Sequence, residues 1–251
     1  MDIAIYNKIK NHCIDNYPNE AGGFIIDGDF VAYENSSTNP TEFYEVSPTS
    51  YADVVDHIEG LVHSHVTTSY SDWRYGNAHY PSVEDLKTQI SWGVPSHILP
   101  LLKYEDKFYP DELVTVGDRE NLPDLWERPF CFGATDCYGF IRDWLTIEQN
   151  KTPPDIAREW NFWNYGKDTY TELLSQSCFT EIDEREIEKG DILLFRLSDT
   201  KIPQHGAVYV ANNLLAHHPG ANKPFDVRNK PKKDLYSRWE KYVVKIVRHT
   251  L

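Results

Sequence analysis

Residues 135–142 have the sequence Thr135-Asp136-Cys137-Tyr138-Gly139-Phe140-Ile141-Arg142, which places a cysteine where a helix is expected to begin. Thr135 and Asp136 favour the N-cap position, and the pattern predicts a helix over residues 137–149. Cys137 is then in the first helical turn, where the helix dipole and a nearby imidazole lower the pKa of a thiol. The order of this cysteine and the later histidines His205 and His217 is typical of hydrolases with a cysteine nucleophile.

The two histidines lie on apolar runs that predict neighbouring strands. His205 begins the run His-Gly-Ala-Val-Tyr-Val, and His217 follows 12 residues later. A turn at Asn212-Asn213 would join the two runs as a hairpin. His205 can then serve as the general base for the thiol, and His217 can orient it as the third member of a triad.

Several stretches of the second half resemble the NlpC/P60 family of cell-wall cysteine peptidases, and they are Asp136–Phe140, Gly190–Phe195, His205–Tyr209 and Leu215–His218. The resemblance covers about residues 125–250 and implies a papain-like core. It also implies hydrolysis of the γ-D-glutamyl–diamino acid amide of peptidoglycan stem peptides. Cys137, His205 and His217 match the nucleophile, the base and the orienting residue, with His218 as the alternative for the third role. Many bacterial relatives have a tyrosine near the scissile carbonyl where this chain has Phe130, so part of the substrate pocket differs.

The other cysteines are expected to be structural. Cys131 is most simply a buried apolar group, and Cys13 and Cys178 are interpreted in the same way. The four cysteines form no CxxC pair, so a disulfide framework is not expected.

A second cluster of chemically active residue types lies in the first half. His63 and His65 follow an apolar run, and alternation along a strand places both imidazoles on one face. Asp85, in the first turn of a predicted helix, can supply a third ligand, which leaves tetrahedral zinc (Zn2+) one open position for water. Glu20 is positioned to take a proton from that water, and Ser82 can donate a hydrogen bond to an oxyanion.

The glutamate, the His-x-His step and the Ser-x-x-Asp step resemble the JAMM (MPN+) metalloprotease family. The family usually has a shorter spacer than the 16 residues of 66–81, which are interpreted as a loop that serves as a lid or a docking surface. A nearer Ser69-x-x-Asp72 also fits the last step, but Asp85 is preferred because Asp72 is placed in the loop. His79, in the same loop, is expected to be exposed.

These patterns predict an α+β chain of two domains with a JAMM-like zinc peptidase domain over 1–110, a linker over 111–127 and an NlpC/P60-like domain over 128–251. The JAMM resemblance implies an α/β/α fold for the first domain. In the second, helices precede strands, which predicts an antiparallel sheet. The expected helices are 3–16, 48–57, 82–92 and 137–149, and the expected strands are 22–27, 30–33, 43–46, 60–63, 97–102, 107–109, 191–197, 205–210, 213–217 and 242–248.

The charge distribution excludes nucleic acid as the main partner. The chain has a net charge of −14, and residues 1–110 contain 16 acidic and 6 basic residues, so phosphate would be repelled. The basic residues after position 222 are interpreted as a solvated edge, with contact to an acidic polymer or a partner subunit as the alternative. We expect no signal peptide, no membrane insertion and synthesis in a cytoplasm.

The order of the two domains resembles the tail tip assembly proteins of long-tailed phages. The resemblance implies a peptidase of the tail tip that acts on peptidoglycan, with other tail tip proteins as partners. It also implies a location in the host cytoplasm during assembly, and then at the virion tail tip and the bacterial wall. Two alternatives stay open. One is an assembly factor whose domains are binding modules, and the other is a cellular isopeptidase, which would cleave ubiquitin chains in a zinc-dependent manner.

Overall fold

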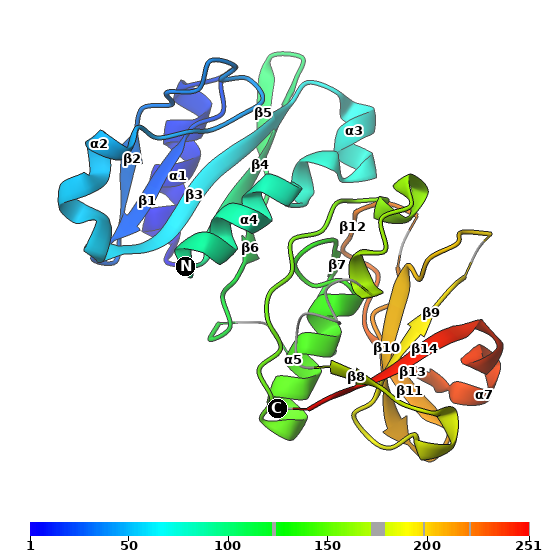
Figure 1. Cartoon of the computed structure of the whole chain (residues 1–251). Coiled ribbons are helices and arrows are strands. Elements are labelled where there is room, and N and C mark those ends of the chain that lie inside the picture. Colours follow the sequence, from blue (N-terminus) through cyan, green and yellow to red (C-terminus); the bar gives the residue numbers. More distant parts are fainter. Residues whose placement is uncertain (122–123, 172–178, 198, 221, 251) are drawn as a thin grey trace. The chain divides into compact units, whose positions relative to one another are not determined.

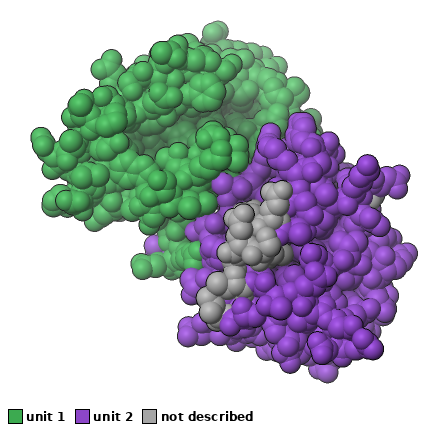
Figure 2. All heavy atoms as spheres, viewed as in Figure 1, with its two compact units in different colours: residues 1–120 green, residues 121–251 purple. Residues whose placement is uncertain are grey.

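The computed structural model describes residues 1–121, 124–171, 179–197, 199–220 and 222–250. It divides into two compact units, residues 1–120 and residues 121–251 (Figure 2). The short strand β6 (Val114–Val116) pairs with β4, so part of the stretch interpreted as a linker belongs to the sheet of the first unit.

The first unit is built on a mixed sheet with the order β2-β1-β3-β4-β5, in which β6 also pairs with β4 (Figure 1). Its strands are β1 (Gly22–Ile26), β2 (Asp29–Tyr33), β3 (Ile58–Thr67), β4 (Ser96–Tyr104) and β5 (Lys107–Pro110). Only the β3–β4 pair is parallel in this sheet. A parallel pair requires a crossover connection, and here it includes α3 (Tyr70–Tyr75), the 3-10 helix Asn77–His79 and α4 (Val83–Trp92).

Helices cover both faces of this sheet. Helix α1 (Ile3–Asp15) places Ile9 and Cys13 against Val62 and the leucines of β4. The opposite face contains Phe24 and Leu61, which pack with Trp92 of α4 and with the region of α2 (Pro48–Tyr51) and the 3-10 helix Ala52–His57. The neighbours Leu61 and Val62 thus face opposite layers, as alternation along a buried strand requires.

Two sequence-based expectations are wrong in this unit. Residues 43–46 form no strand, because the side chain of Asn35 satisfies their backbone: Asn35 Nδ2 donates to Phe43 O at 2.8 Å and Asn35 Oδ1 accepts from Glu45 N at 3.2 Å. Residues 66–81 contain helical turns, which begin at the N-cap Ser69 and pack through Trp73 against His79 at 4.3 Å between ring centroids. Both structures depend on contacts that no local period encodes.

The second unit contains an entirely antiparallel six-stranded sheet with the order β13-β11-β10-β9-β14-β8. The α+β class and the antiparallel sheet expected from the sequence are therefore confirmed. The strands are β8 (Phe179–Glu181), β9 (Ile192–Phe195), β10 (His205–Ala211), β11 (Leu214–His217), β13 (Lys232–Leu235) and β14 (Val243–His249).

Helix α5 (Cys137–Gln149) packs on β10 of this sheet (Figure 1). The approach is close, because a Cβ on Gly206 of β10 would lie 2.7 Å from Cδ1 of Ile141. The start of α5 is thereby held against the strand that begins with His205. The remaining elements are the pair β7 (Phe130–Cys131) and β12 (Phe225–Asp226), α7 (Tyr236–Trp239), and the 3-10 helices Phe162–Tyr165, Glu184–Glu186 and Glu240–Tyr242.

Among the described residues, no helix is both long and apolar enough to cross a membrane.

Candidate active sites

Cys137 is the first residue of α5, and Asp136 is the N-cap, as the sequence predicts. The Asp136 carboxylate accepts hydrogen bonds from Tyr138 N at 3.1 Å, Gly139 N at 3.0 Å and Gly133 N at 3.0 Å. The bonds from Tyr138 and Gly139 satisfy first-turn N–H groups that have no partner inside the helix, and the bond from Gly133 fixes the turn that precedes it. The backbone around the thiol is therefore fixed by a completely buried side chain.

The glycine two residues after the thiol is required by close packing. A Cβ at Gly139 would lie 2.1 Å from the carbonyl oxygen of Ala134. No side chain fits at that distance, so the turn that precedes the helix and the helix itself could not approach as they do.

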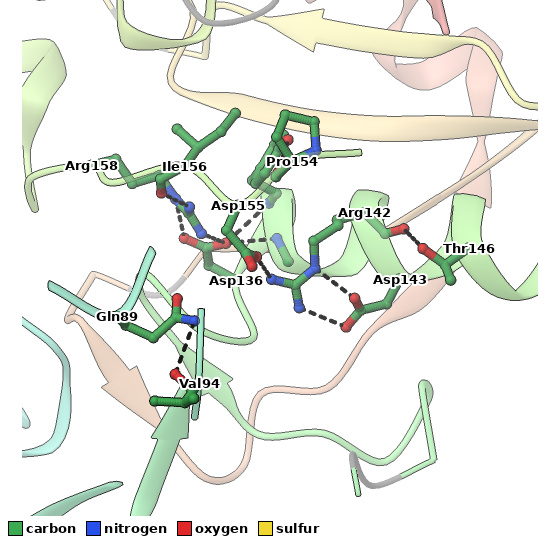
Figure 3. Close-up of polar contacts among 12 residues, drawn as sticks. Gln89, Val94, Asp136, Arg142, Asp143, Thr146, Pro154, Asp155, Ile156 and Arg158 are labelled. Carbon is green, nitrogen blue, oxygen red and sulfur yellow. Dashed lines mark hydrogen bonds and ion pairs between the residues drawn. The ribbon is translucent and has the colours of Figure 1, made fainter. Parts of the chain in front are cut away.

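A buried arginine neutralises the N-cap carboxylate. Arg158 and Asp136 are 3% and 0% exposed, and Arg158 Nε and Nη2 donate to the two carboxylate oxygens at 2.9 and 2.5 Å (Figure 3). Burial alone would raise the pKa of Asp136, but the Arg158 guanidinium and the amide donors hold the pKa of that carboxyl below its usual range.

A second ionic network continues along the same helix. Arg142 Nε donates to Asp143 at 2.7 Å, and an ion pair joins Arg142 to Asp155 (Figure 3). A further ion pair joins Arg128 to Asp143. Both networks tie segments before and after α5 to the helix. Sequence reasoning missed them, because residues 152–176 show no periodicity that locates Asp155 or Arg158.

A chain of hydrogen bonds connects the two predicted histidines and continues to an aspartate. His205 Nε2 lies 2.7 Å from His217 Nδ1, and His217 Nε2 lies 3.1 Å from Asp234 Oδ2. A carboxylate only accepts, so His217 carries its proton on Nε2 and accepts on Nδ1. His205 must then donate from Nε2, which leaves its Nδ1 unprotonated. This tautomer is the one that a general base needs.

Asp234 was not predicted, since residues 218–241 were interpreted as a basic loop. It lies on β13, where Asp234 pairs with Leu215 and Lys232 pairs with His217. The aspartate is thus a diagonal neighbour of His217 on the same face of the sheet. Recognising Lys232–Leu235 as a strand beside β11 would have been sufficient to find it.

His218, the alternative orienting residue, is placed elsewhere. Its Nε2 lies 3.1 Å from Asn229 O, and its ring packs edge-on against Phe130 at 5.3 Å. Phe130 therefore makes an apolar contact with His218, and it has no hydroxyl to offer at the position where the resemblance implies a tyrosine in many relatives. His217, and not His218, is therefore the histidine that is hydrogen-bonded to His205.

The expectation that the Cys137 thiol has a lowered pKa is wrong for the resting site. Cys137 is buried, and burial together with the Asp136 charge raises the pKa of the thiol to about 11. Burial also lowers the pKa of His205 well below its usual value. The resting pair is thus a neutral thiol and a neutral imidazole, and the proton must move as the substrate reacts.

In the first unit, the structure brings His63, His65 and Asp85 together. The two Nε2 atoms lie 3.1 Å apart, and Asp85 oxygens lie 3.2 Å from His63 Nε2 and 3.3 Å from His65 Nε2. Donor atoms bound at about 2.0–2.1 Å to one tetrahedral zinc lie about 3.3–3.4 Å from each other. The two histidine nitrogens have this spacing, and each lies at a similar distance from a different oxygen of Asp85. One ligand atom from each of the three residues can therefore reach a shared ion, and the donor set fits zinc.

Glu20 and Ser82 border the same group. Burial raises the pKa of Glu20 to about 7, with opposing effects of His65 and Asp85, which is a suitable range for a general base. Ser82 is the N-cap of α4, and its Oγ accepts from Asp85 N at 3.1 Å while Asp85 Oδ2 accepts from Ser82 N at 2.7 Å. The Ser82 hydroxyl proton remains available to donate.

These five residues line a cleft of about 820 Å³. Its wall also includes acidic side chains and aromatic rings, among them Glu42, Glu45, Glu84, Tyr44, Tyr51 and Trp92. The cleft is large enough for an extended peptide segment, and its acidity favours a cationic one.

The nearer alternative ligand lies elsewhere. Asp72 is in the first turn of α3, where its Oδ1 accepts from Asn77 Nδ2 at 3.0 Å. The expectation that His79 is exposed is wrong, because its side chain packs in the fold. His79 is 4% exposed, and its Nε2 lies 3.1 Å from Asp111 Oδ2. Cys13 and Cys131 are buried as expected, and Cys178 lies outside the described residues.

Comparisons with known proteins agree with the geometry of the second unit. The model of the NlpC/P60 family matches residues 127–248. These residues belong to the NlpC/P60 family. Tail tip assembly protein K of Escherichia phage N15 is 26% identical over 223 residues, which span 84% of this chain and 83% of that protein. The chain is thus a homologue of tail tip assembly protein K.

Tail tip assembly protein K of Escherichia phage lambda is 30% identical over 104 residues, which span 41% of this chain and 51% of that protein. Among solved structures, an NLP/P60 family protein of Staphylococcus aureus gives a TM-score of 0.33 at 20% identity, covering 51% of this chain and 38% of that one. An NlpC/P60 family protein of Bacillus cereus gives a TM-score of 0.32 at 15% identity, covering 61% and 54%.

Proposed function

We propose that this homologue of tail tip assembly protein K is a peptidase of a phage tail tip, in which Cys137 hydrolyses the γ-D-glutamyl–diamino acid amide of peptidoglycan stem peptides. The hydrogen-bonded series His205–His217–Asp234, which begins on the strand β10 that packs against α5, carries this proposal. It supplies a base with the correct tautomer in a domain of the NlpC/P60 family.

We infer the following reaction for these groups. The Cys137 proton moves to Nδ1 of His205 as Sγ attacks the amide carbonyl, and the backbone N–H of Cys137 at the helix N-terminus can donate to the oxyanion. His205 then gives this proton to the leaving amine, and an acyl-enzyme forms. Water, deprotonated by His205, releases the acid and regenerates the thiol. His217 and Asp234 stabilise the imidazolium that exists between these steps.

Digestion of purified muropeptides tests this function. Wild type is expected to release fragments cut between D-Glu and the diamino acid, as measured by mass spectrometry. Cys137→Ala should abolish this cut, while the matched variant Cys131→Ala, which changes a buried cysteine outside the site, should retain it. Absence of the cut in folded wild type would contradict the proposal and favour an assembly factor whose domains act as binding modules.

We also propose that the first unit is a JAMM-type zinc peptidase or isopeptidase. His63, His65 and Asp85 would hold the ion, as their donor spacing supports. When bound, zinc supplies a Lewis acid and lowers the pKa of a water molecule. Glu20 would accept a proton in the cleft and return it to a leaving amine, and the Ser82 hydroxyl would donate to an oxyanion.

Cleavage of a peptide library tests the zinc site. Wild type loaded with zinc should cleave members that the His63→Ala/His65→Ala variant leaves intact, and the cut should disappear with a chelator and return with zinc. Cleavage that persists in this variant would contradict the assignment. Ubiquitin chains belong in the same panel, because their zinc-dependent cleavage would identify a cellular isopeptidase.

The partners and location follow from the homologues. Two of them are named tail tip assembly proteins, so we propose that this chain binds other tail tip proteins in the host cytoplasm and acts at the cell wall from the virion tail tip. Detection of the chain in purified virions by peptide mass spectrometry tests the location. Its absence from virions, with presence in infected cells, would restrict the role to assembly.

A further inference from the structure

The hydroxyl of Tyr170 touches the sulphur of the cysteine site. Tyr170 Oη lies 3.0 Å from Cys137 Sγ, and the two residues are separated by 33 positions in the chain. Tyr170 is 2% exposed and Cys137 is 6% exposed, so the contact is shielded from water. Neither the predicted triad nor the Asp234 contact accounts for this phenol.

Aromatic neighbours hold the Tyr170 ring in place. Its ring meets Phe162 edge-on, with centroids 5.3 Å apart, and lies 6.5 Å from Tyr138. Phe162 is completely buried. The phenol therefore has little freedom to leave the sulphur.

Tyr170 is able to donate a hydrogen bond throughout the reaction. Burial and the neighbouring Cys137 and Asp136 raise the pKa of Tyr170 well above its usual value, so the phenol keeps its proton. While Cys137 is a thiol, either atom can donate. Once the thiol proton is on His205, only the phenol can donate, and the bond then favours the thiolate.

Other groups around the sulphur shift the pKa of the Cys137 thiol in opposite directions. Asp136 disfavours the thiolate, whereas Arg158 and the backbone N–H of Gly206 favour it. The Asp136 charge is largely matched by Arg158, with which it forms two hydrogen bonds. Beside the Gly206 amide, the Tyr170 hydroxyl is thus a direct donor to a sulphur that burial otherwise keeps protonated.

We propose that Tyr170 is a further catalytic residue of the cysteine site: its hydroxyl donates to Sγ of Cys137 and stabilises the thiolate while the proton resides on His205. The role rests on the proposed cysteine peptidase function. The phenol proton is not transferred, so the proton balance between Cys137, His205 and the leaving amine is unchanged.

The pH dependence of Cys137 alkylation tests this role independently of any substrate. The full chain is treated with iodoacetamide across a pH series, and modification of the peptide containing Cys137 is quantified by mass spectrometry. Tyr170→Phe should move the midpoint upward by about one pH unit, which is about a tenfold lower rate below the midpoint. The control Tyr138→Phe removes a hydroxyl that donates to Pro154 O at 2.8 Å instead of to the sulphur, and it should leave the midpoint unchanged.

Coincident profiles for wild type, Tyr170→Phe and Tyr138→Phe, with all three folded by circular dichroism, would overturn the proposal. Should Tyr170→Phe fail to fold, 3-fluorotyrosine at position 170 keeps the shape and strengthens the donor, so it should lower the midpoint. An unchanged midpoint with this residue would equally overturn it. A shifted midpoint without muropeptide cleavage would reject the peptidase function and retain the Tyr170–Cys137 interaction.

Discussion

Replacing Arg158 by methionine should strongly destabilise the second unit. The substitution leaves the Asp136 carboxylate, which is 0% exposed, without its cation and without the donors at 2.9 and 2.5 Å. Removing one partner of a buried ion pair costs about 3–5 kcal/mol. Because Asp136 is also the N-cap of α5, the substitution destabilises the helical turn that contains Cys137.

Urea unfolding followed by tryptophan fluorescence measures this loss. Five of the seven tryptophans belong to residues 121–251, so the signal reports mainly on the second unit. With a slope near 2 kcal/mol/M, a cost of about 3–5 kcal/mol moves the midpoint down by roughly 1.5–2.5 M urea. The double variant Asp136→Asn/Arg158→Met should lose less than the sum of its single variants, because the neutral amide needs no cation.

An exposed pair provides the matched control. Arg185 and Asp183 also form two side-chain hydrogen bonds, at 2.8 Å each, but in open solvent, so Arg185→Met should leave the midpoint unchanged. A change below about 1 kcal/mol for Arg158→Met would refute the reasoning, because it would mean that water or another cation solvates Asp136.

Four further expectations concern the same sites. Asp234→Ala should lower the rate of stem-peptide cleavage by roughly 10- to 100-fold without changing the urea midpoint, because no carboxylate then holds the His217 proton on Nε2. An unchanged rate would contradict this. Gly139→Ala should cost about 1–3 kcal/mol of stability, because its Cβ would meet Ala134 O, whereas Gly220→Ala, with open space at its Cβ, should cost nothing measurable. Because the pKa of Asp136 is lowered in the folded state, the ionised carboxylate contributes stability above its unfolded pKa of about 3.9, and this contribution is lost as pH falls through the folded pKa. Acid should therefore lower the free energy of unfolding of wild type in this pH range, and it should lower that of Arg158→Met less. Calorimetric titration should find one zinc bound per chain, lost in His63→Ala/His65→Ala and retained in the control His57→Ala, whose exposed imidazole contacts Asp27 instead.

Local signals in the sequence were sufficient for the elements that present the two histidine groups. The caps Ser82 and Asp136 and the alternating runs predicted α4, α5 and the hairpin of β10 and β11, because these features depend on residues a few positions apart. The short strands β7, β8 and β12 were not predicted, since two or three residues carry no detectable period.

The missing site residues depend on distant contacts. Asp234 becomes a neighbour of His217 only through the register of β13, and Tyr170 and Arg158 reach the start of α5 from a segment without periodicity. The thiol pKa was predicted in the wrong direction, because the depth of burial of Cys137 is a property of the packed fold. Sequence patterns thus predicted residue types and order, while the packing determined the electrostatics.

The most direct test of the central claim is capture of the acyl-enzyme. A stem peptide that contains the γ-D-glutamyl–diamino acid amide is mixed with the full chain, quenched in acid within the first turnover, and the digested protein is analysed by mass spectrometry. The account predicts a hydroxylamine-labile thioester on Cys137 that carries the D-glutamyl fragment. Cleavage of this amide by the Cys137→Ala variant at the wild-type rate would contradict it.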